Sequence, residues 1–414
     1  MDVAIPPNQQ PEVAFRELIA SAAKQHGAKV ALLVDEYDKP YAEFFPDREK
    51  AEVVRKFLRG FYTQIKANDE HLRFVFLTGI SKFTKMGVFS TINNLNDISI
   101  LPQYAEICGY TEEELETCFA PHLEALAVST KMPKSELIAK VRNYYDGFSF
   151  DGKVRLYNPY STLLLLQNRV FLNYWIESGT PQLIADYLKD RHLTVEQFRN
   201  LPYSRDSAFA PGEMDSAPPE GYLYQSGYLS LRQGIGDDFV LDYPNTEVLN
   251  AMSALVSRNF IGESNANNLG NLLKMRLRNG DTAGIAGVFD ALLAAIPYDD
   301  YDKAAQCGVL WLDEPLGPRE WLYRSSLLSF VRGTGLSVDA EIHNRHGRAD
   351  MVIRGYGKTL VVEIKIAATA GDAEAKLNEA LTQIKERDYA TQFPGALTLA
   401  IVIDDEQRKI AAWK

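Results

Sequence analysis

A charged pair interrupts an otherwise apolar run near the C-terminus, and this feature limits the possible folds most. Residues 359–366 are TLVVEIKI, in which Glu363 and Lys365 stand two apart among Leu, Val and Ile. Such β-branched runs are typical of buried strands, and residues two apart on a strand project from the same face. Charges inside such a strand are costly unless they are paired or functional. The run therefore predicts a buried strand with two charged side chains on one face.

A further acid precedes this strand by one short turn. Asp350 stands at the start of a predicted strand at 349–354, and Gly355 and Gly357 predict a turn that makes the two strands adjacent. One Asp, one Glu and one Lys would then converge. Carboxylates bind Mg²⁺ or Mn²⁺, which assists phosphodiester hydrolysis, and an ammonium group can orient water or stabilise the transition state. The alternative is a structural salt bridge on an exposed strand face.

The segments around this hairpin predict an α/β domain that begins near residue 300, where the chain becomes irregular and rich in Asp and Pro. The expected order is helix 320–331, strands 337–342, 349–354 and 359–366, helix 372–386 and strand 397–403. His343, Arg345, His346 and Arg348 form a basic turn just before Asp350, which would either hold a phosphate backbone or be a solvated hairpin turn. Zinc is disfavoured there, because no further His or Cys is nearby.

The N-terminal part predicts α/β layering. A helix at 12–26 ends at Gly27, and the apolar run at 29–34 predicts a strand buried on both faces of a parallel sheet. This strand ends in Asp35 and Glu36. A helix at 48–66 and a strand at 72–77, which ends in Thr78, follow. The alternation of strand, helix and strand is the basis of this prediction.

The middle of the chain is mainly helical. The pattern predicts helices from about 112 to 188, a linker or long loop at 205–220, and short strands at 221–224 and 228–232. Helices are expected again from about 246 to 295.

Composition sets broader limits. The 414 residues, of which 46% are hydrophobic, suffice for two or three domains with buried cores. The net charge of −11 argues against a surface coated with positive charge, although a local basic groove is compatible with it. Scattered cysteines (Cys108, Cys118 and Cys307) suit a reducing cytoplasm. Because the sequence also lacks a secretory signal pattern and a run long enough to span a bilayer, we expect a cytoplasmic protein with no membrane partner.

Longer motifs carry a family resemblance. The segment GRADMVIRGYGKTLVVEIKI resembles the PD-(D/E)XK nuclease superfamily, and in particular the nuclease domain that follows an AAA-ATPase-like domain in a large bacterial family. LLVDEYDKP, FVFLTGISKFTKMGVFSTINNLNDIS, NYYDGFSF and YLYQSGYLSLR resemble the same family over most of the chain. The resemblance implies that Asp350, Glu363 and Lys365 are the core triad. It further implies that Glu320 is the upstream helix acid and that Gln383 lines the site, although both also suit ordinary helix positions.

The resemblance also extends to the N-terminal strands. It implies that Asp35 and Glu36 are Walker B acids and that Thr78 is in a sensor position. No G-x-x-x-x-G-K-[ST] loop occurs, and only 34 residues precede Asp35. We therefore expect a truncated or degenerate member, or a misassigned gene start, which calls the use of ATP into question and predicts an exposed sheet edge.

Together these observations predict an α/β multidomain protein. The expected parts are a truncated P-loop ATPase-like α/β remnant at 1–105, a mainly helical middle region with short strands at 106–300, and a restriction-endonuclease-like α/β domain at 301–414. The expected activity is hydrolysis of nucleic acid, DNA by preference, with Mg²⁺ or Mn²⁺ held by Asp350 and Glu363. A homo-oligomer is left open. The alternatives are a nucleoside-triphosphatase or signalling switch, and a nucleic-acid-binding module that has the nuclease fold without turnover.

Overall fold

The computed structural model describes residues 9–44, 47–80, 94–177, 195–204, 219–236, 238–296, 318–344, 347–387 and 393–414. The chain divides into two compact units. Unit 1 comprises 1–108, 149–154 and 202–241, and unit 2 comprises 109–148, 155–201 and 242–414. The three-part division by sequence stays a prediction.

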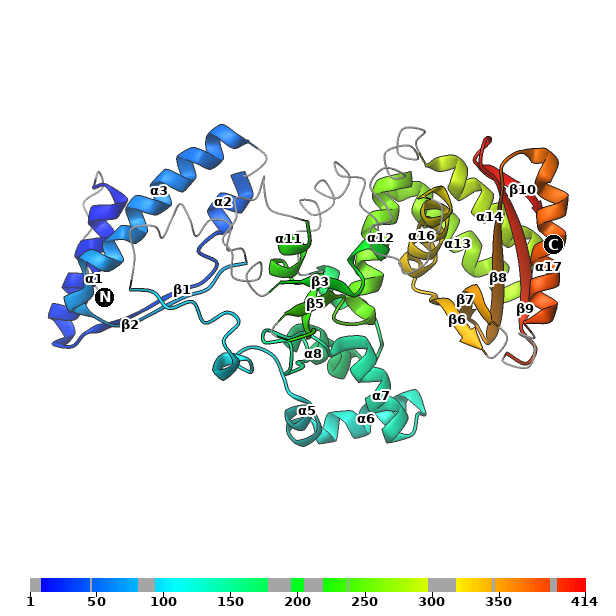
Figure 1. Ribbon diagram of the computed structural model, residues 1–414. Helices are drawn as coiled ribbons and strands as arrows, with labels where there is room; N and C mark the ends of the chain where they lie inside the picture. Colours follow the sequence, from blue (N-terminus) through cyan, green and yellow to red (C-terminus); the bar gives the residue numbers. More distant parts are fainter. Residues whose placement is uncertain are drawn as a thin grey trace. The chain divides into compact units, whose positions relative to one another are not determined.

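Unit 1 begins with the α/β layers that the sequence predicts. Its elements are α1 (Pro11–His26), β1 (Val30–Val34), α2 (Lys39–Phe44), α3 (Arg48–Ala67), η1 (Asp69–His71) and β2 (Leu72–Leu77), and β1 and β2 pair in parallel (Figure 1). Gly27 is the C-cap residue of α1 and adopts the left-handed conformation that glycine commonly takes at the end of a helix. Asp47 is the N-cap residue of α3, and its carboxylate accepts from the backbone N–H of Lys50.

The prediction that the first strand is buried on both faces is wrong. Residues of β1 alternate between half-buried and exposed, and Leu33 is 70% exposed. On β2, Phe74 is 51% exposed. The reason is that α1 and α3 pack with Val30, Leu32 and Val34 in one hydrophobic core, so the residues between them point away from that core.

A second small sheet has the strand order β3 (Leu201–Tyr203), β5 (Phe239–Asp242) and β4 (Ser230–Gln233). The predicted strand at 228–232 is confirmed as β4, with bounds shifted toward the C-terminus. The predicted strand at 221–224 is wrong, because these residues belong to helix α11 (Pro219–Gln225). Aromatic side chains favour strands only where they pack on a sheet. Here Tyr222 and Leu223 are buried as residues of a helix. Most of the predicted linker, 205–218, lies outside the described residues.

Unit 2 contains the predicted helical region. Its elements are α5 (Glu112–Cys118), α6 (Ala120–Thr130), α7 (Lys134–Tyr145), α8 (Pro159–Asn168), η3 (Tyr174–Glu177) and η4 (Glu196–Phe198). Their shared core includes Leu115, Leu123, Leu137, Tyr145 and Leu165. Asn158 is the N-cap residue of α8, and its side chain accepts from the backbone N–H of Ser161, with Pro159 at the first helical position. Residues 178–194 lie outside the described part.

The C-terminal part of unit 2 is a mixed five-stranded sheet between helices. The elements are α12 (Thr246–Ile261), α13 (Glu263–Asn279), α14 (Thr282–Ala295), α16 (Pro318–Gly333), β6 (Ser337–Asn344), β7 (Gly347–Gly355), β8 (Lys358–Ala367), η5 (Ala370–Asp372), α17 (Ala373–Glu386), β9 (Leu397–Asp404) and β10 (Lys409–Trp413). The strand order is β10-β9-β8-β7-β6, with β8 and β9 parallel and the other pairs antiparallel. The predicted α-β-β-β-α-β order is confirmed, and β10, which the sequence pattern missed, adds an edge strand.

The two faces of this sheet have different covers. Met351, Ile353, Leu360, Val362 and Ile364 share one large core with residues of α13, α14 and α16. Helix α17 packs on the other face, beside Val352 and Val361 (Figure 1). Helices that precede residue 300 therefore contribute to the core of the C-terminal sheet. The predicted boundary falls within 297–317, outside the described residues.

No described helix is both long and apolar enough to cross a membrane.

Candidate active site

The hairpin of β7 and β8 brings two acids of the sequence prediction together. Met351 pairs with Val362 in this antiparallel register, so the next step of the register sets Asp350 opposite Glu363. Glu363 lies on the face of the sheet on which α17 packs, where Arg387 contacts it. The carboxylate of Asp350 instead lies between the backbone of β8 and Arg324 of α16. The Glu363 side chain is only 1% exposed, and that of Asp350 is 12% exposed. An acid pair inside an apolar sheet is costly unless cations compensate it.

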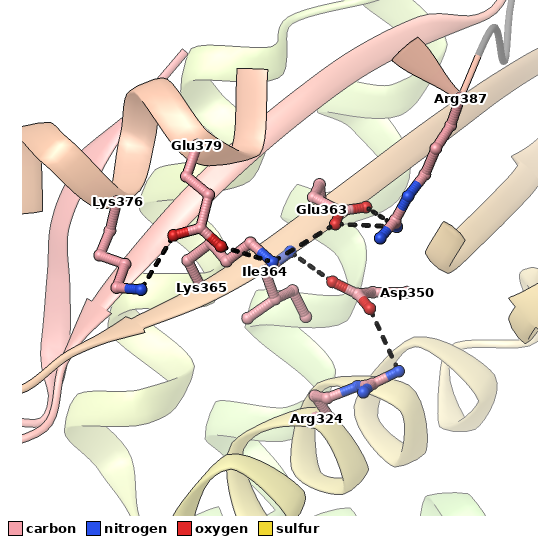
Figure 2. Close-up of polar contacts among 8 residues, drawn as sticks. All are labelled: Arg324, Asp350, Glu363, Ile364, Lys365, Lys376, Glu379 and Arg387. Carbon is pink, nitrogen blue, oxygen red and sulfur yellow. Dashed lines mark hydrogen bonds and ion pairs between the residues drawn. The ribbon is translucent and has the colours of Figure 1, made fainter. Parts of the chain in front are cut away.

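Asp350 has two fixed partners (Figure 2). The backbone N–H of Ile364 donates to Oδ2 of Asp350 at 2.7 Å, which ties the acid to β8. The guanidinium of Arg324, from α16, lies 3.3 Å from Oδ1. The Arg324 side chain is almost fully buried, so this ion pair is shielded from solvent. The carboxylate is thus oriented from two directions.

Glu363 is held by a cation from the end of α17. Nη1 of Arg387 donates to both carboxylate oxygens of Glu363, at 3.1 and 3.2 Å (Figure 2). Nζ of Lys365 lies 3.8 Å from Oε1 of the same carboxylate. The buried charge of Glu363 is therefore shared between a strand neighbour and a helix residue.

Lys365 connects the strand to a second helix acid. Its Nζ lies 3.4 Å from Oε1 of Glu379, whose other oxygen accepts from Lys376 at 2.9 Å. The hydrogen bond from Lys376 is the main cause that lowers the pKa of Glu379, and the charge of Lys365 acts in the same direction. The ammonium of Lys365 is therefore positioned between the carboxylates of Glu363 and Glu379, on the face where α17 packs.

Gln383 lies on the same stripe of α17. Glu379, Gln383 and Arg387 are four residues apart, so they share one helix face, and the outer two reach β8. Oε1 of Gln383 is buried and has no hydrogen-bond partner among the described residues. A buried polar atom without a partner requires an explanation, and a water or a ligand that hydrogen-bonds to it would supply one.

Glu320 lies in the first turn of α16, four residues before Arg324, and is half-buried. Its charge acts on Lys376, whose pKa is raised mainly by the hydrogen bond to Glu379 and further by Glu320. The structure therefore brings Asp350, Glu363 and Lys365 together and sets Glu320 near the cationic side of the cluster. The side chains of the basic turn at 343–348 lie outside the described residues.

Sequence reasoning missed four charged members of the site: Arg324, Lys376, Glu379 and Arg387. A signal was available for two of them, since Glu379 and Arg387 stand four residues on either side of Gln383 on one helix face. Arg324 carried a similar signal, four residues after Glu320. Lys376 carried none beyond its spacing from Glu379, because such pairs are common on exposed helices.

The donor atoms suit a hard divalent cation. No group of three His, Cys, Asp or Glu that could hold a metal occurs in the described ranges. Mg²⁺ does not require such a group, because it keeps several waters and binds through one or two carboxylates together with substrate phosphates. The paired carboxylates of Asp350 and Glu363 and the orphaned Gln383 oxygen fit this pattern. Zinc, which prefers His and Cys, does not fit these donors.

The carboxyl ends of β1 and β2 form a second polar group, in unit 1. The hydroxyl of Thr78 donates to Oδ1 of Asp35 and accepts from the backbone N–H of Glu36 at 3.3 Å. Glu36 has a φ of 52°, in the left-handed region, and pairs with Lys39 at 3.0 Å. Asp38, which sequence reasoning did not select, is buried and accepts from the backbone N–H of Ile80. The structure thus brings Asp35, Glu36 and Thr78 together.

The mixed sheet and the acid–lysine cluster define a class, the PD-(D/E)XK nuclease superfamily, whose family model matches residues 318–413. A model described as a predicted AAA-ATPase matches residues 2–89. Among curated proteins, one described as an uncharacterized protein in vnfD 5'region of Azotobacter chroococcum mcd 1 is 33% identical over 385 residues. The match covers 92% of this chain and 69% of that relative. No solved structure matches the chain significantly.

The chain therefore belongs to the same family as this Azotobacter protein, with an AAA-ATPase-like region followed by a PD-(D/E)XK nuclease superfamily domain. The superfamily indicates a nuclease, which is a hydrolase that binds nucleic acid. The predicted family and fold class are confirmed.

Proposed function

We propose that the C-terminal domain hydrolyses phosphodiester bonds in DNA and requires Mg²⁺ or Mn²⁺. The observation that carries this proposal is the convergence of Asp350, Glu363 and Lys365 at neighbouring positions of β7 and β8, with Ile364 N–H fixing the first acid. Salt bridges to Arg324 and Arg387 compensate the two acids when no cation is bound. Two acids at neighbouring positions of β7 and β8, with a buried amide oxygen on the helix that packs over β8, favour a binding site for a cation.

Each residue has a proposed role. Asp350 and Glu363 would hold the divalent cation, which supplies charge neutralisation and an activated water when it is bound. Lys365, positioned by Glu379, would orient the attacking water or stabilise the charge that develops on the phosphoryl oxygens. The carbonyl oxygen of Gln383 would orient water in the site, and Glu320 would support the cation from α16.

The test compares cleavage of supercoiled plasmid, linear duplex, single-stranded DNA and RNA in Mg²⁺ or Mn²⁺. Asp350→Asn removes one charge from the site, and Asp339→Asn makes the same change on β6, where the acid is exposed and pairs with Arg354. We expect Asp350→Asn to reduce the rate by at least about 100-fold, and Asp339→Asn to leave it nearly unchanged. Equal rates for Asp350→Asn and the native protein would refute the assignment. Preference for RNA would correct the substrate.

Lys365→Ala provides a second test on the same strand. Lys358→Ala is its matched control, because Lys358 is exposed at the first position of β8. We expect loss of cleavage only in Lys365→Ala. If calorimetry detects DNA binding but no metal produces cleavage by the native protein, the domain is a binding module and the catalytic proposal is wrong.

A nucleotide-binding role for unit 1 is the second candidate. The hydrogen bonds that join Asp35, Glu36 and Thr78 at the ends of parallel strands favour it, since Walker B acids occupy such positions. Saturable ATP binding that is lost in Asp35→Asn but retained in Asp69→Asn would support it.

We further propose a cytoplasmic location. The exposed free cysteines Cys108 and Cys118 suit a reducing compartment.

A further inference from the structure

Arg387 is bound to the very oxygens that a divalent cation would use. Its Nη1 lies 3.1 and 3.2 Å from the two carboxylate oxygens of Glu363. A guanidinium so close to a metal ligand would repel a bound divalent cation, because both carry positive charge in a site shielded from solvent. Strong metal binding at Glu363 is therefore opposed as long as Arg387 stays in this position.

We propose that Arg387 is an exchangeable counter-ion of Glu363, which the divalent cation displaces and which then binds a phosphate of the nucleic acid. This inference rests on the proposed function. In the absence of a metal, the guanidinium compensates a carboxylate that is otherwise nearly fully buried. On exchange, Glu363 gains the metal and Arg387 gains the phosphate, so no charge is left without a partner.

The position of Arg387 suits such an exchange better than that of the other cations. It is the C-cap residue of α17, at the end of the helix, and its side chain is 20% exposed. Arg324 lies inside α16 with its side chain 7% exposed, and Lys365 lies inside β8 between two acids. A planar guanidinium can also form two parallel hydrogen bonds to a phosphate, whereas an ammonium acts as a point charge.

The primary test measures Mn²⁺ affinity of the full chain by calorimetry near neutral pH, without nucleic acid. The variants are Arg387→Gln and Arg387→Lys, and the control is Lys385→Gln, which removes one positive charge from an exposed position of the same helix. We expect Arg387→Gln to bind Mn²⁺ about tenfold more tightly than the native protein, a difference of about 1.4 kcal/mol. Lys385→Gln should change the affinity little, and Arg387→Lys should fall between. Circular dichroism verifies that each variant is folded.

The second measurement follows binding of a short DNA duplex with and without Ca²⁺, after electrophoresis has shown that Ca²⁺ leaves the duplex intact. In the native protein Ca²⁺ should increase DNA affinity, because it releases Arg387 toward phosphate. In Arg387→Gln this increase should be several-fold smaller, whereas Lys385→Gln should retain it.

The outcomes separate the inference from the proposed function. In one outcome, Asp350→Asn abolishes Mn²⁺ binding, whereas Arg387→Gln leaves it unchanged or weakens it. This result would overturn the exchange and leave the nuclease proposal standing. Failure of both the native protein and Arg387→Gln to bind Mn²⁺ would overturn both proposals. If Arg387→Gln does not fold, Arg387→Lys gives the decisive comparison. An Arg387→Lys variant with the Mn²⁺ affinity of the native protein and the same increase of DNA affinity by Ca²⁺ would overturn the exchange.

Discussion

A buried carboxyl group in unit 2 makes the stability of this unit depend on pH. Glu247, on α12, is fully buried, and its Oε1 accepts from the backbone N–H of Trp175 at 2.9 Å. Burial is the main cause that raises the pKa of Glu247 from its ordinary value of 4.5 to about 7, and the hydrogen bond from Trp175 opposes this rise only in part. The folded chain therefore retains a proton that the unfolded chain releases.

The sign and size of the effect follow from this pKa. Between the unfolded value of 4.5 and the folded value of about 7, the native state binds more protons, so its stability falls as pH rises. The difference corresponds to about 3 kcal/mol, fully lost above neutral pH. In Glu247→Gln the side chain is neutral at every pH and retains an acceptor for Trp175. The variant should therefore gain stability over the native protein by up to about 3 kcal/mol between about pH 5 and about pH 8.

Urea unfolding followed by tryptophan fluorescence measures this difference. All four tryptophans, Trp175, Trp311, Trp321 and Trp413, belong to segments of unit 2, so their signal reports on that unit. EDTA in every sample excludes metal binding as a contribution. Glu263→Gln, an exposed acid at the start of α13, is the matched control and should show no gain. A stability difference between Glu247→Gln and the native protein that is the same at both pH values would refute the reasoning.

Two further predictions concern unit 2 and use the same assay. Gly147 has a φ of 110°, and an added Cβ would lie 2.0 Å from the carbonyl oxygen of Pro244, so Gly147→Ala should lose more than about 3 kcal/mol or fail to fold. Gly335→Ala, at a φ of 81° with open space around the Cβ position, should lose only about 1 kcal/mol, and equal losses would contradict the proposed clash. Asn158→Ala removes the N-cap side chain of α8 and should lower the free energy of unfolding by about 1 kcal/mol, whereas Asn158→Ser should retain most of the stability. Equal losses in the two variants would show that the cap contributes little.

The C-terminal fold could be predicted closely because its local signals agree with its tertiary environment. Residues 359–366 have the β-branched composition of a buried strand, and the glycines at 355 and 357 mark a turn. Where the environment overrode local preference, the prediction was wrong. Residues 221–224 contain aromatic residues that favour strands, but they form part of a helix. The strand at 30–34 is covered on one face only.

The sequence by itself determined the strand that carries Glu363 and Lys365, because period-two spacing and apolar neighbours depend only on local order. It also determined that Asp350 lies one hairpin away. Only the tertiary structure decided that Arg324 and Arg387 neutralise these acids, since α16 and α17 reach the hairpin through packing on the two faces of the sheet. Side chains from separate elements converge only after the sheet and its helices have formed. For this reason spacing along the chain could indicate which helix face these arginines share with other polar residues, but not which acid each of them neutralises.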